Sequence, residues 1–363
     1  MMRVFYDYQA FFMQKFGGIS RYFYELIKNS QGLYDYSFPR SFSDNIYMNE
    51  LQGKRTFPIK TDFKGKTRII NYLNQAESKK IIKKGAFGIF HPTYYDSYFL
   101  NSLDGKKFVL TIHDMIHEIF PENFSKKDRT KELKKALAFK AERIIAISES
   151  TKNDIIKFYP DLNPEKIDVV YHGNPFEKAE LSFAASEKKE PYILFTGQRG
   201  GYKNFTLFVK AVAPLLKKYN LKLKCTGRSF NREEQEIFDT LKISDRCECT
   251  FASDDELKKL YANALVFAFP SLYEGFGFPI LEAFSCGCPI ALSDASCFPE
   301  IAGDAAVYFD PNSETDIRNK IENIITSEYT RSELIKKGFE RTKKFSWQKC
   351  AAETSKVYEK AMK

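Results

Sequence analysis

The sequence predicts an α/β protein of two domains, each built on a parallel sheet with helices on both faces. The chain has 363 residues, enough for two domains of roughly 150 residues each. Short apolar segments alternate with amphipathic helical segments both before and after residues 174–191, which favours parallel sheets with covered faces. Residues 174–191 are polar, lack periodicity and have a proline near each end, so we expect a linker there.

Residues 1–173 contain the expected elements of the first domain. Strands are expected at Arg3–Tyr6, Gly88–His91, Phe108–Ile112, Arg143–Ile147 and Ile167–Tyr171. Helices are expected at Ile19–Ile27, Lys127–Ala141 and Glu149–Tyr159. Ser148 is the expected cap of the last of these helices, because its hydroxyl can accept a free amide hydrogen of the first turn.

The pattern restarts in residues 192–345, the expected second domain. Its strands are expected at Tyr192–Thr196, Leu221–Thr226, Leu265–Phe269 and Pro289–Leu292, and its helices at Lys203–Lys218, Arg232–Leu241 and Pro279–Ser285. Two such Rossmann-like halves would face a cleft, with ligands bound beyond the carboxyl ends of the strands. A final helix near Trp347–Met362 follows this complete domain, so residues 346–363 are free to pack back on the first one.

Composition excludes several classes of protein. Hydrophobic residues make up 43% and charged residues 28%, as in ordinary globular chains. No apolar run approaches the roughly 18 residues of a membrane span, and the N-terminus lacks a signal peptide's apolar stretch, so we expect a cytoplasmic location. Seven cysteines without Cys-x-x-Cys, and only four histidines, argue against a disulfide framework and a zinc site. Asp-x-Asp is absent, so we do not expect a metal that clamps diphosphate. No other cofactor is expected.

Positive charge is concentrated in one stretch. The net charge of +9 favours anionic partners, and residues 54–84 hold ten Lys or Arg against the two acids Asp62 and Glu77. Apolar residues at roughly helical spacing lie within it: Ile69, Ile70, Leu73, Ile81 and Ile82. The pattern suits an ordinary buried stripe beneath a solvated face, and equally a surface that meets anionic lipid or an anionic acceptor.

The most informative segment is FPSLYEGFGFPILEA, residues 269–283. It follows an apolar strand, and Gly275 and Gly277 allow a ligand to approach the backbone closely. The helix that follows presents free amide hydrogens, which favour an anion such as phosphate. Glu274 and Glu282 on either side can hold hydroxyl groups by charge-assisted hydrogen bonds. Phosphate together with hydroxyls is what a sugar nucleotide offers.

Glu274 and Glu282, with seven residues between them, resemble the Glu-x7-Glu signature of retaining glycosyltransferases of family 4, which have the GT-B fold. The resemblance covers most of the chain. Phe16-Gly-Gly-Ile-Ser-Arg is similar to the family's N-terminal glycine loop, and Thr111-Ile-His-Asp to its histidine-bearing segment. Residues 143–150 resemble its interdomain-facing strand end, and residues 196–204 its Arg/Lys phosphate loop.

The resemblance implies roles for residues of the second domain. Glu274 would hold hydroxyls of the donor sugar, and Glu282 those of the ribose. Arg199 and Lys203 would bind the diphosphate and offset the charge that builds on it as the glycosidic bond breaks. The remaining expected donor contacts are Asn204, Gly227, Arg228, Phe251, Gly275, Phe276, Gly277 and Phe278, of which residues 227, 228 and 251 would lie near the base.

In the first domain, Gly18 would let its loop close over the diphosphate. His113 would lie near the donor sugar and the acceptor, although a lone histidine is as often a structural residue. Asp114 would orient a neighbour or bind the acceptor, and His117 is expected to be structural. The aromatic residues Tyr94, Tyr95, Tyr98 and Phe99 would either stack on sugars or belong to the core.

The expected function is therefore retaining transfer of a sugar from GDP-mannose or a UDP-sugar to a glycan or lipid-linked acceptor. Glu274, His113, Arg199 and Lys203 are the expected catalytic residues. Bacterial lipopolysaccharide, O-antigen or capsule synthesis is the implied setting, with peripheral contact to anionic membrane and no nucleic acid partner. The alternatives are a nucleotide-sugar epimerase on the same fold and a non-catalytic basic binding protein.

Overall fold

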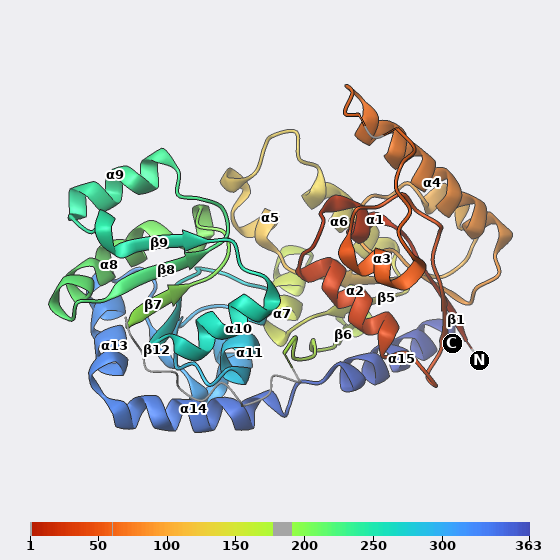
Figure 1. The fold of residues 1–363 in the computed structure, drawn as a ribbon. Coiled ribbons are helices and arrows are strands. Elements are labelled where there is room, and N and C mark those ends of the chain that lie inside the picture. The colour runs from red at the N-terminus through yellow and green to blue at the C-terminus, as the bar shows by residue number, and fades with distance from the viewer. Residues whose placement is uncertain (1, 60, 177–190) are drawn as a thin grey trace. The chain divides into compact units, whose positions relative to one another are not determined.

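The computed structural model describes residues 2–59, 61–176 and 191–363 (Figure 1). Contacts divide the chain into two compact units, the first formed by Met1–Gly173 with Trp347–Lys363 and the second by Asn174–Ser346. Most of the expected linker, residues 177–190, lies outside the described residues. None of the helices in the described part of the chain combines the length and apolar character that a bilayer span requires.

The first unit has a parallel sheet made of two three-stranded parts. The strand orders are β2-β1-β3 and β4-β5-β6, and a parallel bridge between Phe90 and Phe108 joins them. The strands are β1 (Arg3–Tyr6), β2 (Asp35–Ser37), β3 (Ile89–His91), β4 (Val109–Ile112), β5 (Arg143–Ala146) and β6 (Ile167–Val169). The helices are α1 (Gln9–Met13), α2 (Gly18–Lys28), α3 (Ile46–Gln52), α4 (Lys66–Lys84), α5 (Ile116–Ile119), α6 (Thr130–Lys140), α7 (Glu149–Phe158) and α15 (Trp347–Met362).

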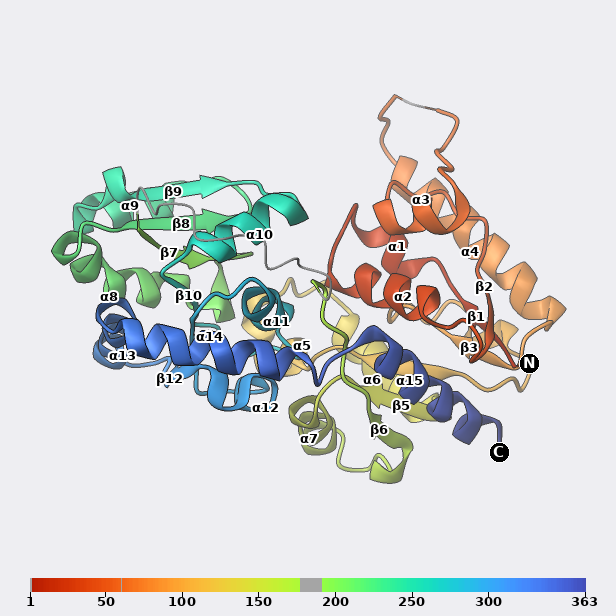
Figure 2. The same cartoon turned by 60° about the horizontal axis from the view of Figure 1, so that its bottom comes forward.

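The last helix, α15, belongs to the first unit (Figure 2). Tyr358 on α15 makes buried hydrogen bonds to Tyr6 (2.8 Å between hydroxyl oxygens) and to Nδ1 of His91 (2.7 Å). A Cβ at Gly173 would lie 2.4 Å from the Trp347 ring, so only glycine permits this close approach. The chain therefore returns to its N-terminal sheet after completing the second unit.

The second unit is a single six-stranded parallel sheet in the order β12-β11-β10-β7-β8-β9. The strands are β7 (Tyr192–Phe195), β8 (Lys222–Thr226), β9 (Cys247–Thr250), β10 (Val266–Phe269), β11 (Ile290–Ser293) and β12 (Val307–Phe309). The helices are α8 (Phe205–Lys218), α9 (Arg232–Leu241), α10 (Asp254–Asn263), α11 (Phe278–Ser285), α12 (Phe298–Ala302), α13 (Glu314–Thr326) and α14 (Glu328–Thr342). Strands β7, β10 and β11 are buried on both faces, as their continuous apolar runs predict.

Local sequence accounts for several helix starts. Ser148 Oγ accepts from the Thr151 amide at 3.0 Å, which confirms the predicted cap of α7. Asn231 with Glu234, and Ser253 with Glu256, form capping boxes at α9 and α10, in which each side chain bonds the other residue's backbone amide. Such caps satisfy amide hydrogens that a first helical turn leaves without partners.

Candidate active site

The segment of residues 269–283 forms the strand-to-helix connection between β10 and α11. Gly277 precedes the helix with φ of 88°, in the left-handed region that glycine tolerates and other residues avoid. A Cβ there would also lie 3.1 Å from Cδ1 of Ile280. Pro279 lies in the first turn of α11, where its missing amide hydrogen costs nothing. This connection thus ends at a helix N-terminus, whose dipole attracts an anion.

Lys203 and Glu274 meet at this connection. Lys203 Nζ lies 2.5 Å from Glu274 Oε1, and both side chains are largely but not fully buried. Lys203 ends a short 3-10 turn that leads into α8, and the amide of Leu272 donates to the carbonyl of Tyr202 at 2.7 Å. The two loops are therefore held together by backbone as well as side chains. A cation and a carboxylate lie side by side at the carboxyl ends of adjacent strands β7 and β10.

Glu282 is held by residues that sequence reasoning missed. Its Oε2 accepts a 3.1 Å hydrogen bond from Tyr261 on α10, whose hydroxyl lies 3.4 Å from Oγ1 of Thr196. Burial raises the pKa of Tyr261 well above its usual value, and the nearby Glu282 carboxylate raises it further. The phenol therefore stays protonated as a donor. No local pattern around Tyr261 marks it, because only packing of α10 on α11 brings it to Glu282.

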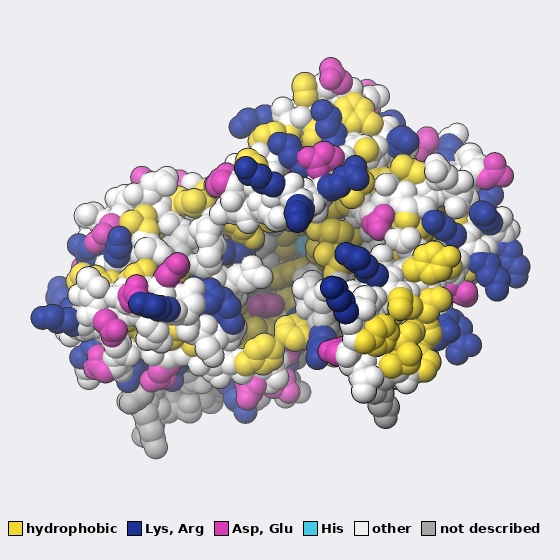
Figure 3. Space-filling view, turned by 90° about the horizontal axis from the view of Figure 1, so that it is seen from above, with side chains coloured by type: hydrophobic (Ala, Val, Ile, Leu, Met, Phe, Trp, Pro, Cys, Tyr) yellow, Lys and Arg dark blue, Asp and Glu magenta, His cyan; other side chains and the backbone are white. Residues whose placement is uncertain are grey.

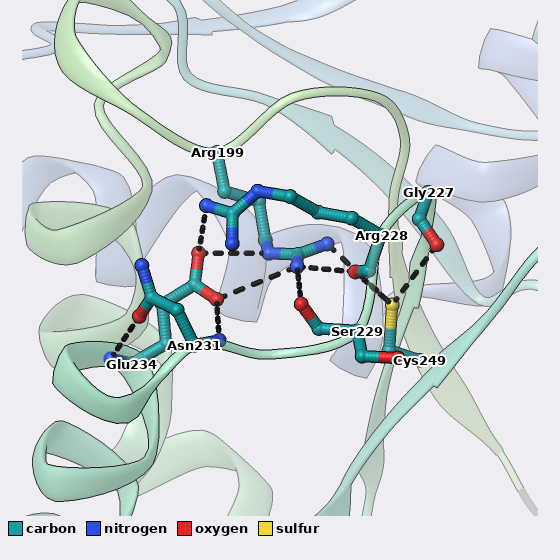
Figure 4. Close-up of polar contacts among 7 residues, drawn as sticks. All are labelled: Arg199, Gly227, Arg228, Ser229, Asn231, Glu234 and Cys249. Carbon is teal, nitrogen blue, oxygen red and sulfur yellow. Dashed lines mark hydrogen bonds and ion pairs between the residues drawn. The ribbon is translucent and has the colours of Figure 1, made fainter. Parts of the chain in front are cut away.

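Arg199 is directed into the fold (Figure 4). Its side chain is fully buried, and its Nε lies 3.0 Å from Oε1 of Glu234. Its Nη2 also donates to the carbonyls of Arg228 and Ser229, at 2.5 and 3.1 Å. The guanidinium therefore holds the loop after β8 against the start of α9. In this structure the guanidinium nitrogens of Arg199 donate to acceptors within the protein. The predicted contact of Arg199 with a diphosphate stays a prediction.

Other predicted donor residues surround the same strand ends. Asn204 adopts a left-handed conformation, and its side-chain amide donates to the Pro311 carbonyl at 2.7 Å, so it positions a loop here. Gly227 has φ of 115°, and a Cβ would lie 3.2 Å from the Gly197 carbonyl oxygen. Arg228 is half-exposed and pairs with Glu234, at 3.2 Å.

Three aromatic side chains differ in exposure. Phe251, which follows β9, is 68% exposed, so its ring is accessible for stacking against a base. Phe276 is buried, with its ring centroid 5.8 Å from that of Phe278. Gly275 lies beside Phe276 in the connection. Their predicted roles stay predictions.

His113 lies in the first unit, directly after β4. Its side chain is buried, and its Nε2 has no hydrogen-bond partner among the described residues. Burial lowers the pKa of His113 to about 4, with Asp114 raising it and Lys134 lowering it further. The imidazole is therefore neutral at pH 7. A neutral ring with an unpaired nitrogen is suited to one hydrogen bond with a polar ligand.

The backbone of the His113 segment is anchored from two sides. The His113 amide donates to the Tyr95 hydroxyl at 3.0 Å, and the Asp114 carbonyl accepts from Lys134 Nζ at 2.8 Å. The Asp114 carboxylate accepts from the amide of Ile116, so it stabilises the following turn. Sequence reasoning missed Lys134, because a lysine at a helix position normally faces solvent.

The remaining predicted residues of the first unit have local roles. Gly18 begins α2 and is exposed. His117 stacks on Phe124 with ring centroids 3.8 Å apart, as its structural interpretation predicts. Of the four aromatic residues Tyr94, Tyr95, Tyr98 and Phe99, the core alternative is confirmed for Tyr95 and Phe99, which are buried. Tyr94 and Tyr98 are partly buried and pack against the same core. Among the described residues, no group of three or more His, Cys, Asp or Glu could hold a metal ion.

Comparisons with known proteins agree with this architecture. The family model "Glycosyltransferase Family 4" matches residues 16–177, and "Glycosyl transferases group 1" matches residues 177–341. The structure of Anabaena Alr3699/HepE in complex with UDP and glucose superposes with a TM-score of 0.75 at 15% identity, covering 99% of both chains. At that identity the likeness shows the fold alone, which is GT-B.

Two curated relatives match part of this sequence. O-antigen chain mannosyltransferase RfbU of Salmonella typhimurium is 31% identical over 218 residues, 59% of this chain and 60% of the relative. O-antigen chain mannosyltransferase B of Escherichia coli is 28% identical over 265 residues, 69% of each chain. The matched region thus spans somewhat more than half of each relative's length.

Proposed function

Because the chain belongs to glycosyltransferase family 4, we propose that it transfers a sugar from a nucleotide-sugar donor to a hydroxyl of a glycan or lipid-linked acceptor, with retention of anomeric configuration. The setting is the synthesis of bacterial lipopolysaccharide, O-antigen or capsule, at the cytoplasmic face of the membrane. The names of the curated relatives, both O-antigen mannosyltransferases, support this setting.

The observation that carries the proposal is the Lys203–Glu274 pair beside the N-terminus of α11. A departing nucleoside diphosphate gains negative charge in the transition state, and a preorganised cation stabilises that charge. Lys203 supplies the cation, and the amides at the start of α11 supply hydrogen-bond donors. In this proposal Glu274 accepts hydrogen bonds from sugar hydroxyls and keeps Lys203 oriented.

Retention follows a same-face course in this proposal. A double displacement needs a carboxylate nucleophile on the far face of the sugar, and no residue is assigned to that role. The leaving phosphate instead takes the proton of the attacking hydroxyl, as in the family. Glu282, oriented by Tyr261, holds the ribose hydroxyls, and neutral His113 accepts or donates one hydrogen bond near the reacting sugar.

We propose GDP-mannose as the first donor to test and UDP-sugars as the second. The relatives' names support mannose, and the UDP of the Anabaena structure supports the uridine alternative. Lys203 supplies the positive charge that a metal would otherwise bring to the diphosphate, so we expect transfer to persist in excess EDTA.

The test incubates the full chain with a panel of nucleotide sugars and lipid-linked or glycan acceptors. Nucleotide release that depends on acceptor supports transfer. Glu274→Gln is expected to lower kcat at least a hundredfold, since it removes the negative charge that binds the sugar hydroxyls and pairs with Lys203. Glu233→Gln, an exposed glutamate on α9 of the same unit, is the matched control and should retain activity. Unchanged turnover in Glu274→Gln, or sugar epimerisation without acceptor, contradicts the proposal.

A further inference from the structure

Helix α4 carries an apolar stripe on its outer face. Ile69, Tyr72, Leu73 and Ala76 follow the i, i+3, i+4, i+7 spacing of a single helix face, and all four are exposed. Tyr72 is 70% exposed and Ile69 45% exposed. Of the apolar residues named from the sequence, Ile69 and Leu73 are exposed, so the alternative of an ordinary buried stripe is wrong there. It is confirmed at the end of the helix, where Ile82 is buried and Ile81 packs against the core.

The inner face of α4 is polar in the middle of the helix and apolar in its last turn, where Ile82 is buried. Asn74 and Ser78 are buried in the middle, and Asn74 accepts from the Phe42 amide at 2.9 Å and donates to the Phe42 carbonyl at 3.0 Å. A surface helix normally buries its apolar stripe and exposes its polar residues. Because Asn74 anchors the middle of the helix through two hydrogen bonds to the Phe42 backbone, the outward orientation of Ile69, Tyr72 and Leu73 is built into the packing. The exposed stripe is thus available to another apolar medium.

Basic residues surround the stripe at both ends. Exposed cations of α4 that make no ion pair with described residues are Arg68, Lys80, Lys83 and Lys84. The preceding loop adds exposed apolar residues, Ile59 and Phe63, beside the exposed Lys64. Figure 3, seen from the side on which α4 projects in Figure 1, shows hydrophobic side chains interspersed with Lys and Arg, and with scattered Asp and Glu, over this unit.

We propose that this outer face of α4 docks the first unit on the surface of an anionic lipid bilayer. Ile69, Tyr72 and Leu73 enter the boundary between headgroups and acyl chains, and the flanking cations contact lipid phosphates. Charge selects this occupant over a second copy of the chain, because pairing two such faces brings cations against cations. The inference deepens the proposed function, on which it rests for the presence of a lipid-linked acceptor.

The experiment measures cosedimentation of the full chain with vesicles of phosphatidylglycerol and phosphatidylcholine, and with phosphatidylcholine alone. We expect binding to the anionic vesicles that weakens as salt rises. Lys80→Gln/Lys83→Gln should weaken it about twenty-five-fold, since each cation near an anionic surface contributes about a factor of five. Ile69→Ser/Tyr72→Ser/Leu73→Ser should abolish it, because the apolar contact is lost.

Matched controls lie on the second unit. Lys210→Gln/Lys217→Gln on α8 and Tyr329→Ser on α14 also change exposed residues, and both should bind vesicles like the unaltered chain. A Tyr72→Trp variant should show a blue-shifted emission with anionic vesicles only, since the native Trp347 is buried. Equal loss in the control variants, or emission unchanged by vesicles, overturns the proposal.

Two further readouts separate the possible outcomes. Sedimentation velocity without lipid should show the same monomeric species for the unaltered chain and the triple Ser variant. A dimer lost in that variant would identify α4 as a protein interface and overturn the bilayer proposal. Glu274→Gln should keep full vesicle binding whether or not it transfers sugar. Failure of the docking surface is therefore distinguishable from failure of the proposed catalytic function.

Discussion

A buried ion pair anchors the segment that carries His113. Lys134 on α6 is completely buried, with its Nζ 2.7 Å from Oε2 of Glu118 and 2.8 Å from the carbonyl of Asp114. The other carboxylate oxygen of Glu118 accepts from the Tyr159 hydroxyl at 2.7 Å. Lys134→Met is nearly isosteric and removes only the charge and its donors. It therefore tests how much this pair contributes to the first unit.

The expected loss is large, because Glu118 would be left buried without a cation. Removing one partner of a buried pair costs about 3–5 kcal/mol. For a domain of roughly 150–250 residues each kcal/mol moves the unfolding midpoint by about 2–4 °C. We therefore expect Lys134→Met to lower the midpoint of the first unit by about 6–20 °C. Activity should fall too, since the Asp114 carbonyl loses its anchor beside His113.

Thermal unfolding followed by circular dichroism measures the effect. Lys134→Met/Glu118→Gln removes both charges and leaves an acceptor for Tyr159, so it should recover most of the loss. Lys131→Met, an exposed position on the same helix, is the matched control and should change the midpoint little. A midpoint of Lys134→Met within 2 °C of the unaltered chain, or a double variant no more stable than the single one, would refute the reasoning.

Three further outcomes are expected. Arg199→Met should lower the free energy of unfolding in urea by about 1–3 kcal/mol, because buried Glu234 and two backbone carbonyls lose a hydrogen-bond donor. An unchanged free energy would show that Arg228 alone is a sufficient partner for Glu234. Gly227→Ala should cost about 1–2 kcal/mol through its positive φ and contact with a carbonyl, whereas Gly200→Ala, in open space, should be neutral in the same assay. The pKa of His113 is about 4 in the folded chain and 6.5 in the unfolded chain, so protonation of this histidine favours unfolding. The free energy of unfolding should therefore decrease as the pH falls from 6.5 to 4. The decrease should be less steep in His113→Gln.

Much of the fold could be predicted because strands and helices obey local rules. β1, α9 and α15 begin and end at the predicted residues, and the other predicted elements lie within a few residues of those observed. Strands β2, β9 and β12 were not predicted. β9 has the charged Glu248 between two cysteines at a sheet edge, so it lacks the apolar run that marks a central strand. Short edge strands depend on their neighbours for pairing more than on their own residues.

The candidate site was predicted in part. The Glu274 and Lys203 segments were found because glycines, a helix start and charged residues lie close together in the sequence. The hydrogen bonds of Tyr261 and Lys134 could not be found, since each joins segments at least 20 residues apart. Arg199 illustrates the opposite case: a basic residue in a phosphate-loop pattern whose guanidinium packs against Glu234, 35 residues along the chain.

The sequence by itself determined the two parallel α/β units, the glycine connection before α11 and the excess of positive charge in residues 54–84, because these depend on composition, periodicity and backbone conformation over short spans. Only the tertiary structure decided which side chains meet and which face outward. Burial orients Arg199 inward, pairs Lys203 with Glu274 and turns the apolar stripe of α4 to the outside. Such choices arise from the packing of distant segments, where desolvation of each charge must be matched by a partner that the local sequence does not reveal.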